Sequence, residues 1–154
     1  MAALGNTNCI VCDFVVTSLQ LYNHFGSPEQ EHNMSVFTVP LTLQLHNIPS
    51  RIYCNKDIQP ALLAALTYAA DSNLQDLIKT WDGCFNIRKK RGSASTSLHS
   101  WGYAVDINAA WNRFGKQPTM PASIVRCFEK NGFDWGGHWK VPDGMHFQLA
   151  EIPK

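Results

Sequence analysis

The sequence predicts an α+β fold in which helices pack on a small, mostly antiparallel sheet. Two segments, 57–71 and 122–130, place their apolar residues at helical spacing. Several shorter segments are rich in β-branched and aromatic residues and are bounded by turn signals, as is typical of strands. The order along the chain is a strand, a helix, and then several short strands with a second helix. Helices layered on an antiparallel sheet fit this order best.

The N-terminal part of the chain gives the weakest structural signals. Residues 14–21 can form a short helix or a short strand. Residues 36–46 are rich in β-branched residues and alternate cleanly from Leu41 onward, which predicts a half-buried strand with an edge or an irregularity at Pro40. We therefore expect an N-terminal segment of unclear role at residues 1–35 and a folded domain at 36–154.

The two predicted helices have recognisable ends. Asp57 can cap the helix 57–71, and Pro60 lies in its first turn. Pro121 precedes the helix 122–130, which Asn131-Gly132 ends. A further helical stretch and three more strands complete the prediction, in the order 74–80, 84–88, 103–107 and 145–149.

Composition limits the function without choosing it. At 154 residues, the chain is expected to form one domain with a sizeable core. Charged residues make up only 16% and the net charge is +1, so a nucleic-acid surface is not indicated. The single basic cluster, Arg88-Lys89-Lys90-Arg91, runs into a turn-like Gly-Ser-Ala-Ser stretch. Its two lysines are expected to lie in a solvated loop.

The five cysteines indicate no disulfide framework. They are odd in number and scattered, and no secretory signal or membrane span is recognisable. Cys9 and Cys12 form a Cys-x-x-Cys without a second pair at zinc-ribbon spacing. The cysteines are therefore expected to be small, buried, reduced residues, with a metal or redox role for the pair as the alternative.

Three side chains could share a metal ion. His99 and Asp106 lie seven residues apart, where a loop is predicted to run into a strand, and His146 follows in the last strand. A catalytic zinc takes three protein ligands of these types and keeps one position for water. The alternative is a set of ordinary polar residues. Ser97 and Asn108 are candidates for hydrogen bonds that orient the ligands.

Asp143 is a candidate general base for such a site. Pro142-Asp143-Gly144 is a strong turn signal, and Gly144 is available for a positive φ. The turn can bring Asp143 and His146 into the same cleft, although residues three apart on a straight strand point to opposite faces. A carboxylate beside a zinc-bound water can take its proton.

These motifs together resemble the signature of a known family. Ser97-x-His99-x-x-Gly102-x-Ala104-x-Asp106, followed by Asp143-x-x-His146, is similar to the VanY-type zinc peptidases. That group includes D-alanyl-D-alanine carboxypeptidases and the L-alanyl-D-glutamate peptidases of phage endolysins. The resemblance runs from about residue 56 to 150. It implies the fold shared with the lysostaphin and hedgehog domains, and a zinc peptidase catalytic domain at 36–154.

The resemblance also assigns roles. It implies that His99, Asp106 and His146 hold one catalytic Zn²⁺ and that Asp143 is the catalytic carboxylate. The family places an arginine before the first motif to stabilise the oxyanion, and Arg88 matches best, with Arg91 as the alternative. Three residues are predicted to bind substrate; they are Ser97, His138 and Trp139. Related sequences often carry a charged residue where His138 stands.

The expected function is hydrolysis of a peptide bond in a peptidoglycan stem. An L-alanyl-D-glutamate endopeptidase of a bacteriophage endolysin is the first expectation, made in the host cytoplasm without a signal peptide and either released to the wall by a holin or carried on the virion. A D-alanyl-D-alanine carboxypeptidase and a non-catalytic wall-binding or tail module are the alternatives. We expect a monomer whose partner is the stem peptide, with no nucleic acid and no membrane insertion.

Overall fold

The computed structural model describes residues 15–43 and 46–154 and contains three helices and six strands in this part of the chain. The helices are α1 (Ser18–Phe25), α2 (Ile58–Asp71) and α3 (Ala122–Lys130). The strands are β1 (Met34–Thr38), β2 (Arg51–Asn55), β3 (Trp81–Gly83), β4 (Ala104–Ile107), β5 (Phe133–Trp135) and β6 (His146–Leu149).

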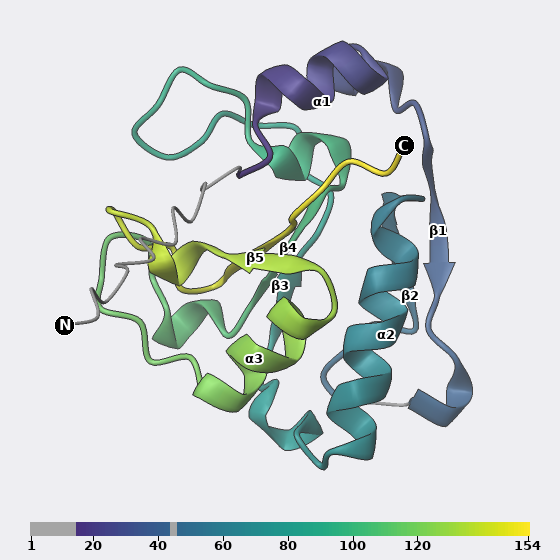
Figure 1. Cartoon of the computed structure of the whole chain (residues 1–154), viewed down its shortest axis with the longest axis vertical. Helices are drawn as coiled ribbons and strands as arrows, with labels where there is room; N and C mark the ends of the chain where they lie inside the picture. The colour runs from purple at the N-terminus through teal and green to yellow at the C-terminus, as the bar shows by residue number, and fades with distance from the viewer. Residues whose placement is uncertain (1–14, 44–45) are drawn as a thin grey trace, which may run out of the picture.

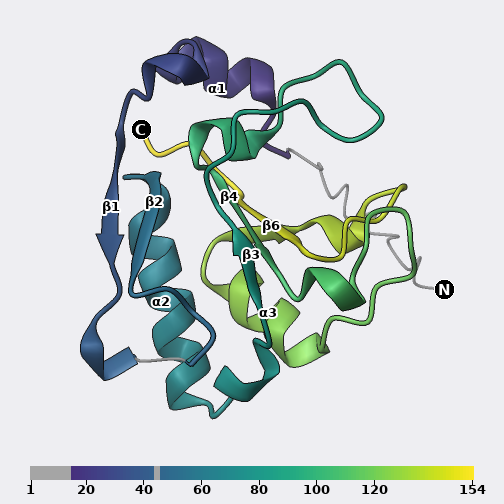
Figure 2. The same cartoon turned by 180° about the vertical axis from the view of Figure 1, so that it is seen from behind.

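The strands form two antiparallel sheets. β1 and β2 make a two-stranded ribbon, and the other four pair in the order β3-β4-β6-β5. In Figure 1, α3 lies in front of the larger sheet, and Figure 2 shows the strands from the opposite side. The α+β prediction with a mostly antiparallel sheet is therefore confirmed.

The core lies between the larger sheet and the helices. The α3 residue Phe128 is fully buried, and its ring centroid lies 4.5 Å from that of Phe147 on β6 and 5.3 Å from that of Phe133 on β5. The helix α2 packs beside α3 and against β2. This apolar packing fixes β6, which carries two residues of the site described below.

The helix α1 belongs to the same core. Thr17 and Gln20 form a capping box at its start, which satisfies backbone N–H groups that a helix leaves free. Its residues Leu21 and Phe25 are buried in the cluster that contains the sheet residues. The indole of Trp101 donates to the carbonyl of Gly26 just after the helix. The described part of the N-terminal segment therefore packs against the rest of the molecule.

The strand predicted at 36–46 is only partly present. β1 begins at Met34 and ends at Thr38, and Leu41–Leu43 forms a 3-10 turn. The amide of Leu43 donates to the carbonyl of Pro40, so the alternation after Pro40 belongs to a turn. Residues 44 and 45 lie outside the described residues. The partner strand β2 was not predicted.

Other element predictions had mixed outcomes. The helix 122–130 and the strands 103–107 and 145–149 are confirmed, with small shifts at the strand ends. The prediction of a strand at 84–88 was wrong: β3 precedes it, and the segment is irregular. The helical stretch at 74–80 is reduced to a single 3-10 turn.

The helix 57–71 is also confirmed, but its cap differs from the prediction. Asp57 makes no side-chain capping bond; its carboxylate accepts a hydrogen bond from Asn33 instead. That contact connects the start of α2 to the residue before β1.

The cysteine prediction is confirmed where it can be examined. Cys54, Cys84 and Cys127 are buried free thiols, and Cys9 and Cys12 lie outside the described residues. Burial raises the pKa of Cys127 to about 11, which keeps its thiol protonated. Within the described ranges, no helix has the length and apolar character needed to cross a bilayer.

Candidate metal centre

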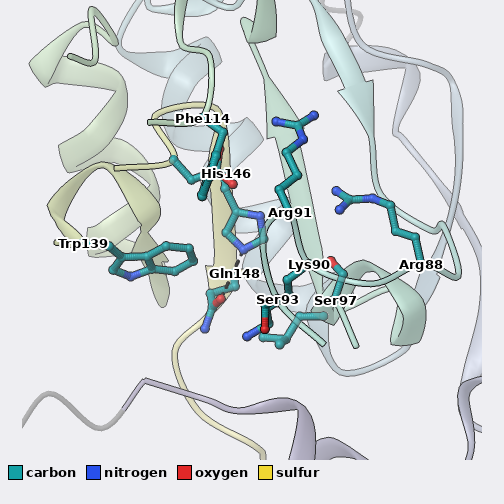
Figure 3. Close-up of a pocket in the computed structure, with 11 residues that line it drawn as sticks. Arg88, Lys90, Arg91, Ser93, Ser97, Phe114, Trp139, His146 and Gln148 are labelled. Carbon is teal, nitrogen blue, oxygen red and sulfur yellow. Dashed lines mark hydrogen bonds between the residues drawn. The ribbon is translucent and has the colours of Figure 1, made fainter. Parts of the chain in front are cut away.

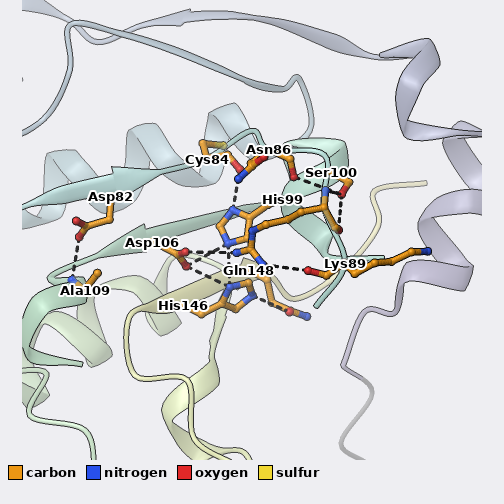
Figure 4. Close-up of polar contacts among 11 residues, drawn as sticks. Asp82, Cys84, Asn86, Lys89, His99, Ser100, Asp106, Ala109, His146 and Gln148 are labelled. Carbon is orange, nitrogen blue, oxygen red and sulfur yellow. Dashed lines mark hydrogen bonds and ion pairs between the residues drawn. The ribbon is translucent and has the colours of Figure 1, made fainter. Parts of the chain in front are cut away.

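His99, Asp106 and His146 converge at one buried point (Figure 4). The His99 Nε2 atom lies 3.1 Å from Asp106 Oδ1 and 3.1 Å from His146 Nδ1. His146 Nδ1 lies 3.3 Å from the same carboxylate oxygen. The three residues are between 2% and 9% exposed. Three side chains distant in sequence thus present one ligand atom each to a common centre.

The sheet register brings two of these residues together. Asp106 on β4 and His146 on β6 are direct partners across an antiparallel pair. Side chains of directly opposed residues lie on the same face, with Cβ atoms about 5 Å apart. His99 comes from the 3-10 turn Leu98–Trp101, which immediately precedes β4.

Hydrogen bonds fix which ring nitrogen of each histidine faces the centre. The Nδ1–H of His99 donates to the carbonyl of Cys84 over 2.7 Å, which leaves Nε2 unprotonated. The Nε2–H of His146 donates to Gln148 Oε1 over 3.1 Å, which leaves Nδ1 unprotonated. Both rings therefore direct a lone pair at Asp106.

Gln148 connects the centre to the N-terminal part of the chain. Its Nε2 donates to the carbonyl of Val16, 132 residues away in sequence, over 3.1 Å. The side chain is 2% exposed, so it has both of its amide groups paired in a buried position. The amide orientation is thereby determined: the oxygen accepts from His146 and the nitrogen donates to Val16.

Gly102 allows the turn that carries His99 to lie close to β2. It has a φ of +62°, and a Cβ there would lie 2.7 Å from the backbone nitrogen of Asn55 and 3.0 Å from Cys54 Cα. The carbonyl of Gly102 accepts a hydrogen bond from the Asn55 amide. Only glycine fits both the conformation and the space.

Asp106 remains ionised in this setting. Burial favours its protonated form, but the contacts with His146 and His99, at 3.3 Å and 3.1 Å, hold the pKa of the carboxyl well below its usual range. A guanidinium nitrogen of Arg88 lies 3.9 Å from the second carboxylate oxygen. The centre therefore offers one anionic and two neutral ligands.

Asp143 lies at the edge of the same centre. The turn that holds it is closed by hydrogen bonds from the Asp143 amide to Gly136 and from the His146 amide to Asp143. Burial raises the pKa of Asp143, and the charge of Asp106 adds to this effect, while nearby cations, Arg91 among them, oppose it. Its Oδ1 atom is buried and has no hydrogen-bond partner among the residues that the structure describes.

Gly144 serves this turn in a different way from the one predicted. It does not have a positive φ. A Cβ at this position would lie 2.8 Å from Pro118 Cβ and 3.2 Å from Asn112, so the residue is required for space. The turn packs tightly against the segment that follows β4.

A cavity of about 220 Å³ opens onto the centre (Figure 3). Asp143, His146 and Gln148 line it, which places the Asp143 carboxylate at the cavity wall. Figure 3 shows Trp139 on the side of His146 opposite Arg88. The remaining lining residues are Lys90, Arg91, Ser93, Ser97, Leu98 and Phe114.

Two of the three predicted substrate-binding residues line the cavity, and the third does not. Ser97 and Trp139 line the cavity, and the Trp139 ring centroid lies 5.2 Å from that of His146. His138 is not among the lining residues; its side chain is 63% exposed and pairs with Glu129 over 2.8 Å. Its role in substrate binding stays a prediction.

The ligand-orienting groups were not those predicted. Asn108 accepts hydrogen bonds from the amides of Lys79 and Thr80 and donates to Leu77, so it stabilises the chain before β3. The Cys84 carbonyl and Gln148 orient the histidines instead. Residues two apart on a strand share a face, so the position of Gln148 two residues after His146 in the sequence could have identified it. A backbone carbonyl leaves no signal in the sequence.

The cluster fits a single tetrahedral zinc ion. Zinc–ligand bonds of about 2.0–2.1 Å at tetrahedral angles separate neighbouring ligand atoms by roughly 3.3 Å. The three distances between 3.1 and 3.3 Å agree with this separation. Two imidazole lone pairs and a carboxylate around one point also require a cation or a shared proton between them.

Comparisons with known proteins identify the segment that carries these residues. Residues 91–149 match the model of a family described as D-alanyl-D-alanine carboxypeptidase, and this segment contains the three ligands and Asp143. Among solved structures, the L-Ala D-Glu endopeptidase ChiX from Serratia marcescens matches with 22% sequence identity and a TM-score of 0.43. The match covers 73% of this chain and 88% of the ChiX chain. No curated protein matches significantly.

Proposed function

We propose that the protein is a zinc-dependent peptidoglycan peptidase that cleaves a bond of the stem peptide; residues 91–149, which match the model of the D-alanyl-D-alanine carboxypeptidase family, hold the site that supports this proposal. The convergence of His99, Asp106 and His146 beside Asp143 carries this proposal. It supplies three ligands and a separate carboxylate on a cavity wall, which a metal-assisted peptide hydrolysis needs.

The residues of the site have distinct tasks in this reaction. Zinc held by the three ligands would supply a Lewis acid and lower the pKa of a bound water. Asp143 takes the proton of the attacking water through its free Oδ1 and returns it to the leaving amine. Arg88, 3.9 Å from Asp106, directs its guanidinium at the negative charge that develops on the scissile carbonyl.

We propose the L-alanyl-D-glutamate bond as the cleaved bond, in cell-wall degradation by a bacteriophage endolysin. The resemblance of the two motifs to those of endolysin peptidases supports this assignment. The description of the matching family favours a second candidate, removal of a terminal D-alanine. The two reactions release different products from the same peptidoglycan.

Replacing the base tests the mechanism. The Asp143→Asn variant should lose about 10²- to 10⁴-fold in turnover, because the amide cannot accept the proton of the water. Zinc content should stay at one ion per chain, since Asp143 is not a ligand. The loss of wild-type activity as the pH falls through the pKa of Asp143 should be absent in the variant. Turnover on purified peptidoglycan and metal analysis give the two readouts.

Product analysis identifies the cleaved bond. Mass spectrometry of the digest should find new amino-terminal D-glutamate for an endopeptidase, or free D-alanine for a carboxypeptidase. A zinc-loaded wild-type chain that releases neither product would contradict the proposed function. An Asp143→Asn variant with wild-type turnover would contradict the assignment of the base alone. Asp71→Asn, a substitution of an exposed carboxylate at the end of α2 and outside the cavity, serves as the control.

A further inference from the structure

A pair of buried cysteines lies beside the turn that carries His99. Cys54 belongs to β2 and is 0% exposed, and Cys84 directly follows β3 and is 6% exposed. Both lie against Gly102, the residue after the turn. The Sγ atom of Cys84 is 3.6 Å from the carbonyl oxygen of Gly102, and a Cβ on Gly102 would lie 3.0 Å from the Cα atom of Cys54. The two cysteines are thus neighbours in space, although α2 and β3 separate them in the sequence.

The residues next to the two cysteines also place β2 and the segment after β3 side by side. The rings of Tyr53 and Phe85 meet edge to face, with centroids 5.3 Å apart and an interplanar angle of 88°. Tyr53 is exposed while Cys54 is buried, as the alternation of side chains along a strand requires. The aromatic pair therefore lies at the surface, and the thiols face the core.

The two thiols contact each other. A hydrogen bond between them lowers the pKa of Cys54 and raises the pKa of Cys84, and burial adds to the rise at Cys84. Cys127 is different: its thiol donates to the carbonyl of Ala65 over 3.3 Å, and no cysteine lies beside it in the described part of the chain. Of the three described cysteines, Cys54 and Cys84 are therefore the two placed to react with one another.

The pair is connected to the metal centre through the backbone of Cys84. Its carbonyl accepts the Nδ1–H of His99 over 2.7 Å (Figure 4). A disulfide brings two sulfur atoms to about 2.05 Å, closer than hydrogen-bonded thiols, so one of the two residues has to move. β2 is paired with β1 along its whole length, whereas the chain from Cys84 onward is irregular. The movement therefore falls mainly on Cys84 and on the carbonyl that orients His99.

We propose that Cys54 and Cys84 form a redox-sensitive pair, and that closing a disulfide between them weakens zinc binding at the metal centre. The oxidant is a small-molecule disulfide. One cysteine attacks it, forms a mixed disulfide and releases one thiol; the other cysteine then displaces the second thiol. Two protein S–H groups are oxidised to one S–S bond, and the two released thiols carry the electrons and the two protons. This inference rests on the metal assignment and not on the bond that the protein cleaves.

Peptide mapping tests whether the disulfide forms. The full chain is incubated with oxidised glutathione, its remaining thiols are alkylated, and it is digested with trypsin without reduction. Cleavage after the flanking lysines and arginines puts Cys54 in the peptide 52–56 and Cys84 in the peptide 80–88. Mass spectrometry should find these two peptides joined, and Cys127 alkylated in the peptide 127–130. Their absence as a joined pair after full incubation would overturn the proposal.

Competition with a chromophoric chelator tests the effect on zinc. The protein for this measurement carries Cys9→Ser and Cys12→Ser, so that the Cys-x-x-Cys pair neither oxidises nor binds the ion. Oxidation should lower its zinc affinity about 10- to 100-fold, the range expected when a metal-bound histidine loses the partner that orients it. Reduction with a phosphine, followed by its removal, should restore the affinity without any substitution in the pair.

Two further variants on the same background show where the effect arises. Cys54→Ala cannot form the disulfide and should keep its zinc affinity after the same oxidation. Cys127→Ala retains the pair and should lose affinity as its parent does. A joined peptide 52–56/80–88 with unchanged zinc affinity overturns the connection to the metal centre. An equal loss of affinity in Cys54→Ala, or a loss that the phosphine does not reverse, overturns it as well.

Discussion

Single side chains determine how the metal ligands are presented. Gln148 receives the Nε2–H of His146, and this bond leaves Nδ1 free for a metal. Such partners of metal-bound histidines typically change metal affinity about 10- to 100-fold when they are removed. The contact from Gln148 to the Val16 carbonyl makes this orientation depend on the chain just before α1.

Substituting this residue should weaken zinc binding before it affects the fold. Gln148→Leu is expected to lower zinc affinity about 10- to 100-fold, because the His146 ring loses the acceptor that fixes its tautomer. Gln148→Glu keeps an acceptor and should recover most of the affinity. Competition with a chromophoric chelator measures both values. Equal zinc affinity in Gln148→Leu and the wild type would exclude the positioning role; Gln117→Leu, an exposed glutamine outside the cavity, is the control.

The functional residues were more predictable than their supporting contacts. The spacing of His99, Asp106, Asp143 and His146 carried enough information to predict one site, because the three ligands and the base stand in the order of the family signature that the two motifs resemble. The sequence could not decide whether Arg88 or Arg91 lies beside the ligands, because both belong to a loop whose path depends on the Lys89–Thr96 bridge. The structure puts the guanidinium of Arg88 nearer to Asp106.

The length of each helix or strand decided whether the sequence could predict it. The helices α2 and α3 have nine or more residues each, enough for a helical period to appear. β3 and β5 have three residues each, too few to show an alternation, and they form through pairing with β4 and β6. Conversely, Leu41–Leu43, where the alternation after Pro40 begins, forms a 3-10 turn.

Gly102 and Gly92 both have a positive φ, and comparing their substitutions tests how much the close approach of the turn before β4 to β2 matters. Gly102→Ala should destabilise the protein by about 3 kcal/mol, from the left-handed conformation and from overpacking against Asn55. Gly92 has a φ of +66° but open space around it, so Gly92→Ala should lower the free energy of unfolding by only about 1 kcal/mol. Urea denaturation gives both free energies. Similar losses in the two variants would show that the close approach to β2 contributes nothing.

At the scale of the whole molecule, the metal centre connects a 3-10 turn to two paired strands of the larger sheet. His99 comes from the turn Leu98–Trp101, Asp106 from β4 and His146 from β6. Removing the ion leaves two imidazoles and a carboxylate that can share a proton, so the fold should loosen without being lost.

Chelation should therefore lower the thermal stability of the protein. An ion present at 100 times its dissociation constant adds about 2.7 kcal/mol to the free energy of unfolding. The Tm should fall by several degrees in EDTA and return when zinc is restored in excess. Asp106→Asn, which loses the anionic ligand, should respond much less to either treatment. A wild-type Tm that is the same in EDTA and in zinc would contradict the metal assignment.

The bridge between Lys89 and Thr96 also bears on how this protein could change over time. It brings the two ends of the loop 89–96 together before the chain enters the turn that holds His99. The segment between those ends can then become longer or shorter, or be replaced as a unit, while the strands that carry Asp106 and His146 keep their register. Under the proposed function, selection for a different cell-wall peptide could act on this short stretch of the gene alone.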